Sequence, residues 1–127
     1  MRILDVGCGA GDVALLAAEL VGESGTVVGI DRSEADIIAA RARAATAKNV
    51  HFLVTSPDDT LDAASFDIVI GRYVLIFQGD VASFLRASAR LVKPGGILAF
   101  HEIDDGGEGS WVSCSKAWLW QLALPFR

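Results

Sequence analysis

The segment from Gly7 to Gly11 carries three glycines, a pattern typical of a loop that binds a nucleotide-like ligand. Because glycine has no Cβ and tolerates positive φ, a ligand can approach the backbone of such a loop closely. A helix is expected directly after the loop, and its N-terminus would offer free N–H groups at the positive end of a dipole. Asp31 stands twenty residues beyond Gly11, where an acidic residue of a doubly wound sheet hydrogen-bonds ribose hydroxyls.

The glycine spacing discriminates between two classes of nucleotide cofactor. A dinucleotide fingerprint has the form G-x-G-x-x-G, and counting from Gly7 puts Asp12 where the third glycine would stand. An aspartate at the start of the helix would repel a pyrophosphate, whereas a zwitterionic amino-acid tail with a sulfonium carries no phosphate. Asp5, just before the loop, suits a ligand that bears ammonium and sulfonium groups. These residues therefore favour S-adenosylmethionine over a dinucleotide.

These residues need a framework, and the hydrophobic pattern predicts alternating strands and helices. Apolar strands are expected at residues 2–6, 26–30, 50–54, 66–70 and 97–100, and helices at 12–21, from an N-cap at Ser33 to about 47, and at 81–92. Turns are expected at 56–59, where a short helix could begin, and at 93–96, with an acidic loop at 104–109 and an apolar, helical segment at 110–127. Apolar strands that alternate with helices predict a parallel sheet covered on both faces.

Composition narrows the class of protein further. The chain has 127 residues, which suits one domain at 1–127, and 52% of them are hydrophobic, enough for a substantial core. The net charge is −5 and the basic residues are scattered, so neither a nucleic-acid nor a membrane partner is expected. Cys8 and Cys114 form neither a disulfide framework nor a metal-ligand spacing. No secretory signal or membrane-spanning run is evident, so a cytoplasmic protein is expected.

Four segments resemble motifs of the class I S-adenosylmethionine-dependent methyltransferases. Ile3–Gly11 resembles their first motif, and Val27–Asp31 resembles the second-strand motif that ends in a ribose-binding acid. Phe66–Ile70 resembles the fourth-strand motif, and Leu91–Gly96 resembles the turn before the fifth strand. The resemblance covers residues 2 to about 104. It implies a Rossmann-like α/β fold, doubly wound and mostly parallel, with about five strands in the order 3-2-1-4-5 and helices on both faces.

The same resemblance implies a role for individual residues in binding S-adenosylmethionine. The methionine end of the pocket would be shaped by the first motif, that is by Asp5, Gly7, Cys8, Gly9 and Gly11. Asp31 would hold the ribose, and Arg32 would lie beside the adenine. Arg72, just after the fourth strand, matches a position whose backbone often meets the methionine portion.

Two departures from that family concern the adenine and the sheet edge. Similar enzymes often carry a Gly-Asp-Ala-like run after the third strand, and its acid binds the adenine. This chain has Thr55-Ser56-Pro57 at that place, so Ser56, Pro57, Asp58 or backbone groups would substitute for the acid.

Similar enzymes also have a helical segment before the first strand and two strands after the fifth, so the chain is expected to be shortened at both ends. The fifth strand would then be an exposed apolar edge. We expect a fragment, a minimised domain, or a homo-oligomer formed through this edge or through the tryptophan-rich C-terminal segment.

Several other residues have two interpretations. His101 and Glu102 fall at the carboxyl end of the fifth strand, where they are either weak candidates for a general base or simply polar residues that end a strand. Tyr73 and Phe77 follow the fourth strand, and packing against the helix at 81–92 is favoured over lining a substrate pocket. No metal site can be assembled from the sequence.

The function predicted from these observations is S-adenosylmethionine-dependent methyl transfer to a small-molecule acceptor. The main alternative is a catalytically incompetent fragment or partner-dependent subunit that still binds the cofactor. A nicotinamide-dependent oxidoreductase is a further alternative, which the glycine spacing disfavours. No catalytic residue is assigned.

Overall fold

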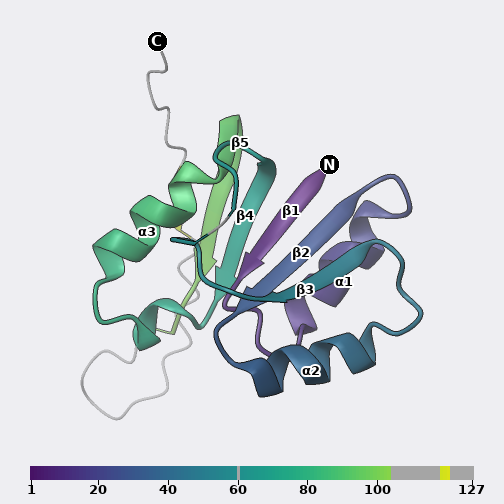
Figure 1. Ribbon diagram of the computed structural model, residues 1–127. Helices are drawn as coiled ribbons and strands as arrows, with labels where there is room; N and C mark the ends of the chain where they lie inside the picture. Colours follow the sequence, from purple (N-terminus) through teal and green to yellow (C-terminus); the bar gives the residue numbers. More distant parts are fainter. Residues whose placement is uncertain (60, 104–117, 121–127) are drawn as a thin grey trace.

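A single six-stranded sheet forms the centre of the protein in a computed structural model, which describes residues 1–59, 61–103 and 118–120 (Figure 1). The strand order is β3-β2-β1-β4-β5-β6. The strands are β1 Arg2–Val6, β2 Thr26–Asp31, β3 Val50–Val54, β4 Phe66–Arg72, β5 Val92–His101 and β6 Trp118–Trp120. The first five strands are parallel, in the predicted order 3-2-1-4-5. This arrangement is the Rossmann-like α/β fold that the sequence predicts.

Helices cover both faces of the sheet (Figure 1). Helix α1 (Asp12–Val21) and helix α2 (Glu34–Arg43) pack on one face, and helix α3 (Val81–Arg90) packs on the other. Strand β1 lies between the two layers, so successive side chains point to opposite faces. Ile3 joins the core under α1 and α2, whereas Leu4 and Val6 join the core under α3.

Local signals explain where the helices begin and end. Ser33 is the N-cap of α2, and its Oγ accepts a hydrogen bond from the Asp36 N–H at 3.2 Å, as predicted. Helix α2 ends at Arg43, earlier than the predicted boundary near residue 47. Asp80 caps α3 in the same way, by accepting from the Ser83 N–H at 3.0 Å. The predicted turn at 56–59 is present, closed by a hydrogen bond from the Asp59 N–H to the Ser56 carbonyl at 3.2 Å, and no helix begins there.

The prediction of a separate turn at 93–96 is wrong, because these residues lie inside β5. The pairing of β4 with β5 shifts register between Phe66 and Ile68, which is the mark of a bulge. Pro94 lacks an N–H and Gly95 has a φ of 78°, and both features suit an irregular stretch of strand. The proline and glycines at 93–96 therefore do change the direction of the chain, but they bend a strand rather than precede one.

The predicted helix at 110–127 is contradicted at residues 118–120, which form β6 antiparallel to β5. The pairing aligns Leu98 with Trp120 and Phe100 with Trp118. The fifth strand is therefore not a bare edge at these residues, so the β5 edge gives less reason to expect a homo-oligomer there. In a short apolar run of tryptophan and leucine, hydrophobic periodicity cannot distinguish a helix from a strand, which explains the error. The predicted loop at 104–109 and Trp111 lie outside the described residues.

Within the described part of the chain, no helix is both long enough and apolar enough to cross a membrane.

Replacing Gly11 by alanine should lower the free energy of unfolding by roughly 2–4 kcal/mol, combining left-handed strain with overpacking. Gly11 has a φ of 89°, and an added Cβ would lie 2.8 Å from Cζ of Phe52. Gly9→Ala is the matched control, because Gly9 has a φ of 52° and nothing lies within 4 Å of its added Cβ. The control should lose only about 1–2 kcal/mol in urea denaturation. Equal losses in the two variants would show that Phe52 does not constrain the loop.

Candidate cofactor-binding site

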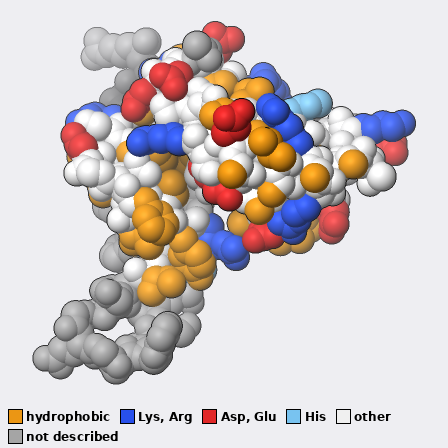
Figure 2. Space-filling view, turned by 60° about the horizontal axis from the view of Figure 1, so that its bottom comes forward, with side chains coloured by type: hydrophobic (Ala, Val, Ile, Leu, Met, Phe, Trp, Pro, Cys, Tyr) orange, Lys and Arg blue, Asp and Glu red, His pale blue; other side chains and the backbone are white. Residues whose placement is uncertain are grey.

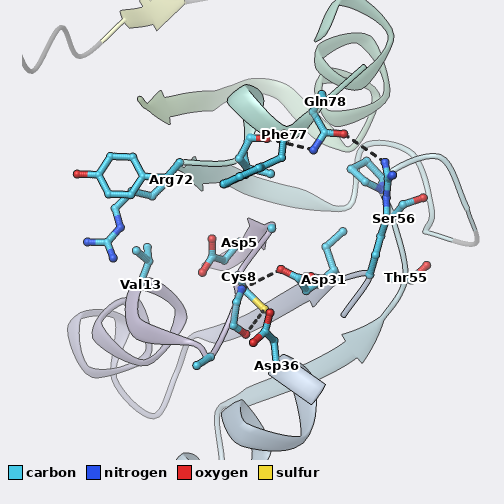
Figure 3. A pocket seen from close by; sticks show the side chains of 18 of the residues that line it. Asp5, Cys8, Val13, Asp31, Asp36, Thr55, Ser56, Arg72, Phe77 and Gln78 are labelled. Carbon is cyan, nitrogen blue, oxygen red and sulfur yellow. Dashed lines mark hydrogen bonds between the residues drawn. The ribbon is translucent and has the colours of Figure 1, made fainter. Parts of the chain in front are cut away.

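A cavity of about 460 Å³ opens where the parallel strands end, and the glycine loop forms its floor (Figure 3). A volume of this size is typical of small-molecule and cofactor sites. Nine of the eleven cofactor residues predicted from the sequence line it: Asp5, Gly7, Cys8, Gly9, Asp31, Arg32, Ser56, Pro57 and Arg72. The topology brings them together because β1, β2 and β4 are neighbours in the sheet.

Gly11 and Asp58 are the two predicted residues that do not line the cavity. Gly11 is buried against Phe52 and Ala40, so it allows the loop to pack on β3 and α2 rather than touching a ligand. Asp58 is exposed. Its neighbour Asp59 is the residue that accepts hydrogen bonds from Ser56 Oγ at 3.0 Å and from Thr55 Oγ1 at 3.2 Å.

Asp31 links the glycine loop to the start of α2. Its Oδ2 accepts a hydrogen bond from the Gly9 N–H, and its Oδ1 accepts one from the Ser33 N–H, both at 2.9 Å. Each carboxylate oxygen has a second lone pair, so the group can still accept hydrogen bonds from a ligand. Asp31 thus fixes the loop and presents an acceptor pair at the cavity wall.

Asp5 is a buried carboxyl group in the wall of the same cavity. Its side chain is only 1% exposed, and burial raises its pKa to about 7, although the backbone amide of Ala14 and the charge of Arg72 act in the opposite direction. Among the described residues, Asp5 Oδ2 has no hydrogen-bond partner. Buried polar atoms are normally partnered, so this oxygen suits a ligand that brings a donor, such as an ammonium group.

Cys8 contributes its small size rather than reactivity. The side chain is buried, and its Sγ lies 3.6 Å from the Gly9 carbonyl oxygen. Burial, together with the nearby charges of Asp5 and Asp31, raises the pKa of the Cys8 thiol to about 12. The thiolate, which is the nucleophilic form, is therefore scarce at neutral pH.

An ionic cluster braces the loop from the other side. Asp12 lines the cavity, forms an ion pair with Arg43 at 2.6 Å and lies 3.9 Å from Arg72. The Arg43 guanidinium also donates to the Ala10 carbonyl at 2.8 Å. The pairs are largely exposed, so each contributes at most about 1 kcal/mol to stability. Their main effect is to hold α2 against the loop.

The segment after β4, residues 73–78, supplies a wall that sequence reasoning largely missed. Tyr73, Val74, Phe77 and Gln78 all line the cavity. The sequence favours packing for Phe77, which is wrong because its side chain is 76% exposed. Tyr73 is half-buried and, like Phe77, lines the cavity. Asp36 of α2 also lines the cavity, and its only sequence signal was its place in the first turn of a helix that follows Asp31.

Neither weak catalytic candidate lines the cavity. His101 is exposed, and its ring lies 5.4 Å from the ring of Tyr73. Glu102 Oε1 accepts hydrogen bonds from the backbone of Val74 and Leu75. The general-base interpretation therefore gains no support. The described residues also include no group of three or more metal-ligating side chains.

Comparison with known proteins identifies the family. A model of the methyltransferase domain matches residues 1–121. The chain is 38% identical over 102 residues to aklanonic acid methyltransferase DauC of Streptomyces sp. (strain C5), covering 78% of this chain and 46% of that protein. It is 39% identical over 106 residues to a ubiquinone biosynthesis O-methyltransferase of Thiobacillus denitrificans, covering 81% of this chain and 44% of the relative.

Solved structures agree with this result. A crystal structure of a SAM dependent methyltransferase from Aquifex aeolicus superposes with a TM-score of 0.74 at 28% identity, over 85% of this chain and 61% of that one. The chain belongs to the methyltransferase domain family, for which S-adenosylmethionine is the implied cofactor. It spans less than half the length of the two curated relatives.

The residues present fit that cofactor. The unpartnered Asp5 oxygen lies in the wall of the cavity, Gly9 leaves open space above the loop, and Asp31 keeps free acceptor capacity. Asp12 at the start of α1 places a negative charge where a pyrophosphate would otherwise bind. The site therefore suits a ligand with a cationic amino-acid end and a ribose.

The raised pKa of Asp5 predicts a specific dependence of stability on pH. Below about pH 4 the carboxyl is protonated in both the folded and the unfolded chain. Between about pH 4 and 7 only the folded chain keeps the proton, so this group lowers the free energy of unfolding progressively, by up to about 4 kcal/mol. Asp5→Asn removes that loss, so the variant should gain stability relative to the native chain as the pH rises through this window.

Urea denaturation at several pH values measures this difference, with Asp58→Asn as the control because Asp58 is exposed. The control should differ from the native chain by a nearly constant amount at all pH values. A constant difference for Asp5→Asn as well would contradict the raised pKa.

Proposed function

We propose that this chain binds S-adenosylmethionine in the cavity and supports methyl transfer to a small-molecule acceptor. The observation that carries the proposal is the buried, unpartnered Asp5 oxygen, which lies in one cavity with the glycine loop and Asp31. A ligand with an ammonium group and a ribose can hydrogen-bond to both Asp5 and Asp31. A dinucleotide fits neither the spacing of the glycines nor the negative charge of Asp12.

The protein contributes binding and orientation. When bound, the cofactor supplies an electrophilic methyl group on a sulfonium. Asp31 would hold the ribose hydroxyls, Asp5 would face the ammonium group, and Gly9 lets the ligand approach the backbone. Tyr73 and Phe77 would offer an aromatic wall to the acceptor. Because displacement at a methyl group requires in-line approach, such positioning can supply much of the rate acceleration without an assigned base.

A small organic acceptor is the proposed substrate class. The relatives' names refer to aklanonic acid and to ubiquinone biosynthesis, both small-molecule chemistry. On the face to which the carboxyl ends of the strands point, basic side chains are scattered among acidic and hydrophobic ones (Figure 2). Together with the net charge of −5, this disfavours a nucleic-acid acceptor. The buried free thiol of Cys8 is in keeping with a cytoplasmic location, which we propose as well.

We also propose self-association through the C-terminal segment, which contains all three tryptophans of the chain. The edge of β5 gives this proposal less support, because β6 pairs with β5. A concentration-dependent mass in analytical ultracentrifugation would support it, and a monomer at all concentrations would refute it.

The alternative function, cofactor binding without turnover, is not favoured, because the family model and the relatives are named for methyl transfer. Both functions would use the same cofactor site, and they differ only in whether a labelled methyl group leaves the bound cofactor for any acceptor.

Calorimetric titration with S-adenosylhomocysteine tests the shared site. Asp31→Ala should weaken binding by roughly 10- to 100-fold, because hydrogen bonds to a charged acceptor contribute about 1.5–3 kcal/mol. Asp58→Ala is the control and should bind as the native chain does, since Asp58 does not line the cavity. Absence of binding by the native chain, or tighter binding of NADH than of S-adenosylhomocysteine, would refute the proposal.

A further inference from the structure

The segment after β4, residues 73–78, is held in place by the end of β5. The Val74 N–H and the Leu75 N–H both donate to Glu102 Oε1, at 3.0 and 3.1 Å. Just before them, the Tyr73 N–H donates to the His101 carbonyl at 2.9 Å. The three successive backbone amides of residues 73–75 thus donate to two adjacent residues at the end of β5, His101 and Glu102.

This segment needs such support because its backbone is strained. Tyr73 has a φ of 54°, a left-handed conformation that costs a residue other than glycine about 1–2 kcal/mol. The strain persists only where the surrounding structure holds the residue. The hydrogen bonds that follow it at Val74 and Leu75 supply that restraint, and hydrogen bonds to a carboxylate are stronger than those to a neutral acceptor.

Val74 packs the segment at residues 73–78 against the glycine loop. It is only 6% exposed, and its side chain occupies the space beside Gly7, where an added Cβ would lie 2.8 Å from Val74 Cβ. It also fills the space beside Gly71, within 2.9 Å of an added Cβ. A shift of Val74 would therefore change how closely the wall presses on the loop.

At the far end of the segment, the Gln78 side chain makes two hydrogen bonds (Figure 3). Gln78 Nε2 donates to the Val74 carbonyl at 3.1 Å, and Gln78 Oε1 accepts from Arg32 at 3.2 Å. Arg32 directly follows Asp31, so the segment links the end of β4 to the proposed ribose site. The whole wall, from the loop to the ribose acid, is therefore one connected unit.

We propose that Glu102 is a positioning residue, which sets the shape of the cofactor cavity by holding the amides of Val74 and Leu75. Glu102 does not line the cavity, so it acts on a ligand only through this segment. The inference rests on the proposed function for the identity of the ligand. The role of Glu102 in holding the wall can be measured without any ligand.

The test compares Glu102→Ala with Glu102→Gln, which keeps an acceptor oxygen, and with Glu19→Ala, which removes an exposed glutamate from α1. Amide hydrogen exchange is followed residue by residue by NMR, and S-adenosylhomocysteine affinity by calorimetry. In Glu102→Ala, the amides of Val74 and Leu75 should exchange at least about tenfold faster while those of β1 keep their native rates, and affinity should fall about tenfold. Glu102→Gln should stay closer to the native chain, and Glu19→Ala should match it.

Several outcomes would overturn the inference. In Glu102→Ala, native exchange rates at Val74 and Leu75 would contradict it, and so would exchange that is equally accelerated in β1. An unchanged affinity in that variant, when the native chain binds S-adenosylhomocysteine, would also contradict it. So would a Glu102→Gln variant that is as impaired as Glu102→Ala. If the native chain binds no S-adenosylhomocysteine, the proposed function fails, and the exchange rates alone still decide whether Glu102 holds the wall.

Discussion

The loop between β1 and α1 must pass through positive φ at Gly7, Gly9 and Gly11, and this backbone constraint underlies the whole site. Side chains press on it from two directions, Val74 at Gly7 and Phe52 at Gly11. Only the middle glycine faces open space, so the loop offers its backbone to a ligand at that point. The hydrogen bond from the Gly9 N–H to Asp31 then ties the loop to β2, and a largely preformed cavity results.

Local signals made much of this predictable from the sequence. The strands β1 and β3 and the helix α1 have the predicted bounds, and the glycines and Asp31 fall where their spacing placed them. Features that depend on distant partners were missed. The wall at residues 73–78 is positioned by the end of β5. Residues 93–96 continue a strand only because a bulge in the β4–β5 pairing accommodates them, and residues 118–120 form a strand because β5 offers an edge. No pattern within those segments carries that information.

The charges that line the cavity determine which ligand groups it can bind. Burial leaves the Asp5 carboxyl with a pKa of about 7, so near neutral pH it is ionised in only part of the molecules. A cationic ligand group beside it would favour the ionised form, and binding would release protons. Arg72 and Asp12 border the same space, so the cavity also holds a partner of each sign for a zwitterionic tail.

A crystal structure of the chain with S-adenosylhomocysteine tests the central claim most directly. We expect ligand density in the cavity, with the ribose hydroxyls within hydrogen-bonding distance of Asp31 and the amino-acid end beside Asp5 and the glycine loop. Density in a different pocket, a reversed orientation with the adenine beside Asp5, or no ligand density in crystals grown at a saturating concentration would contradict it.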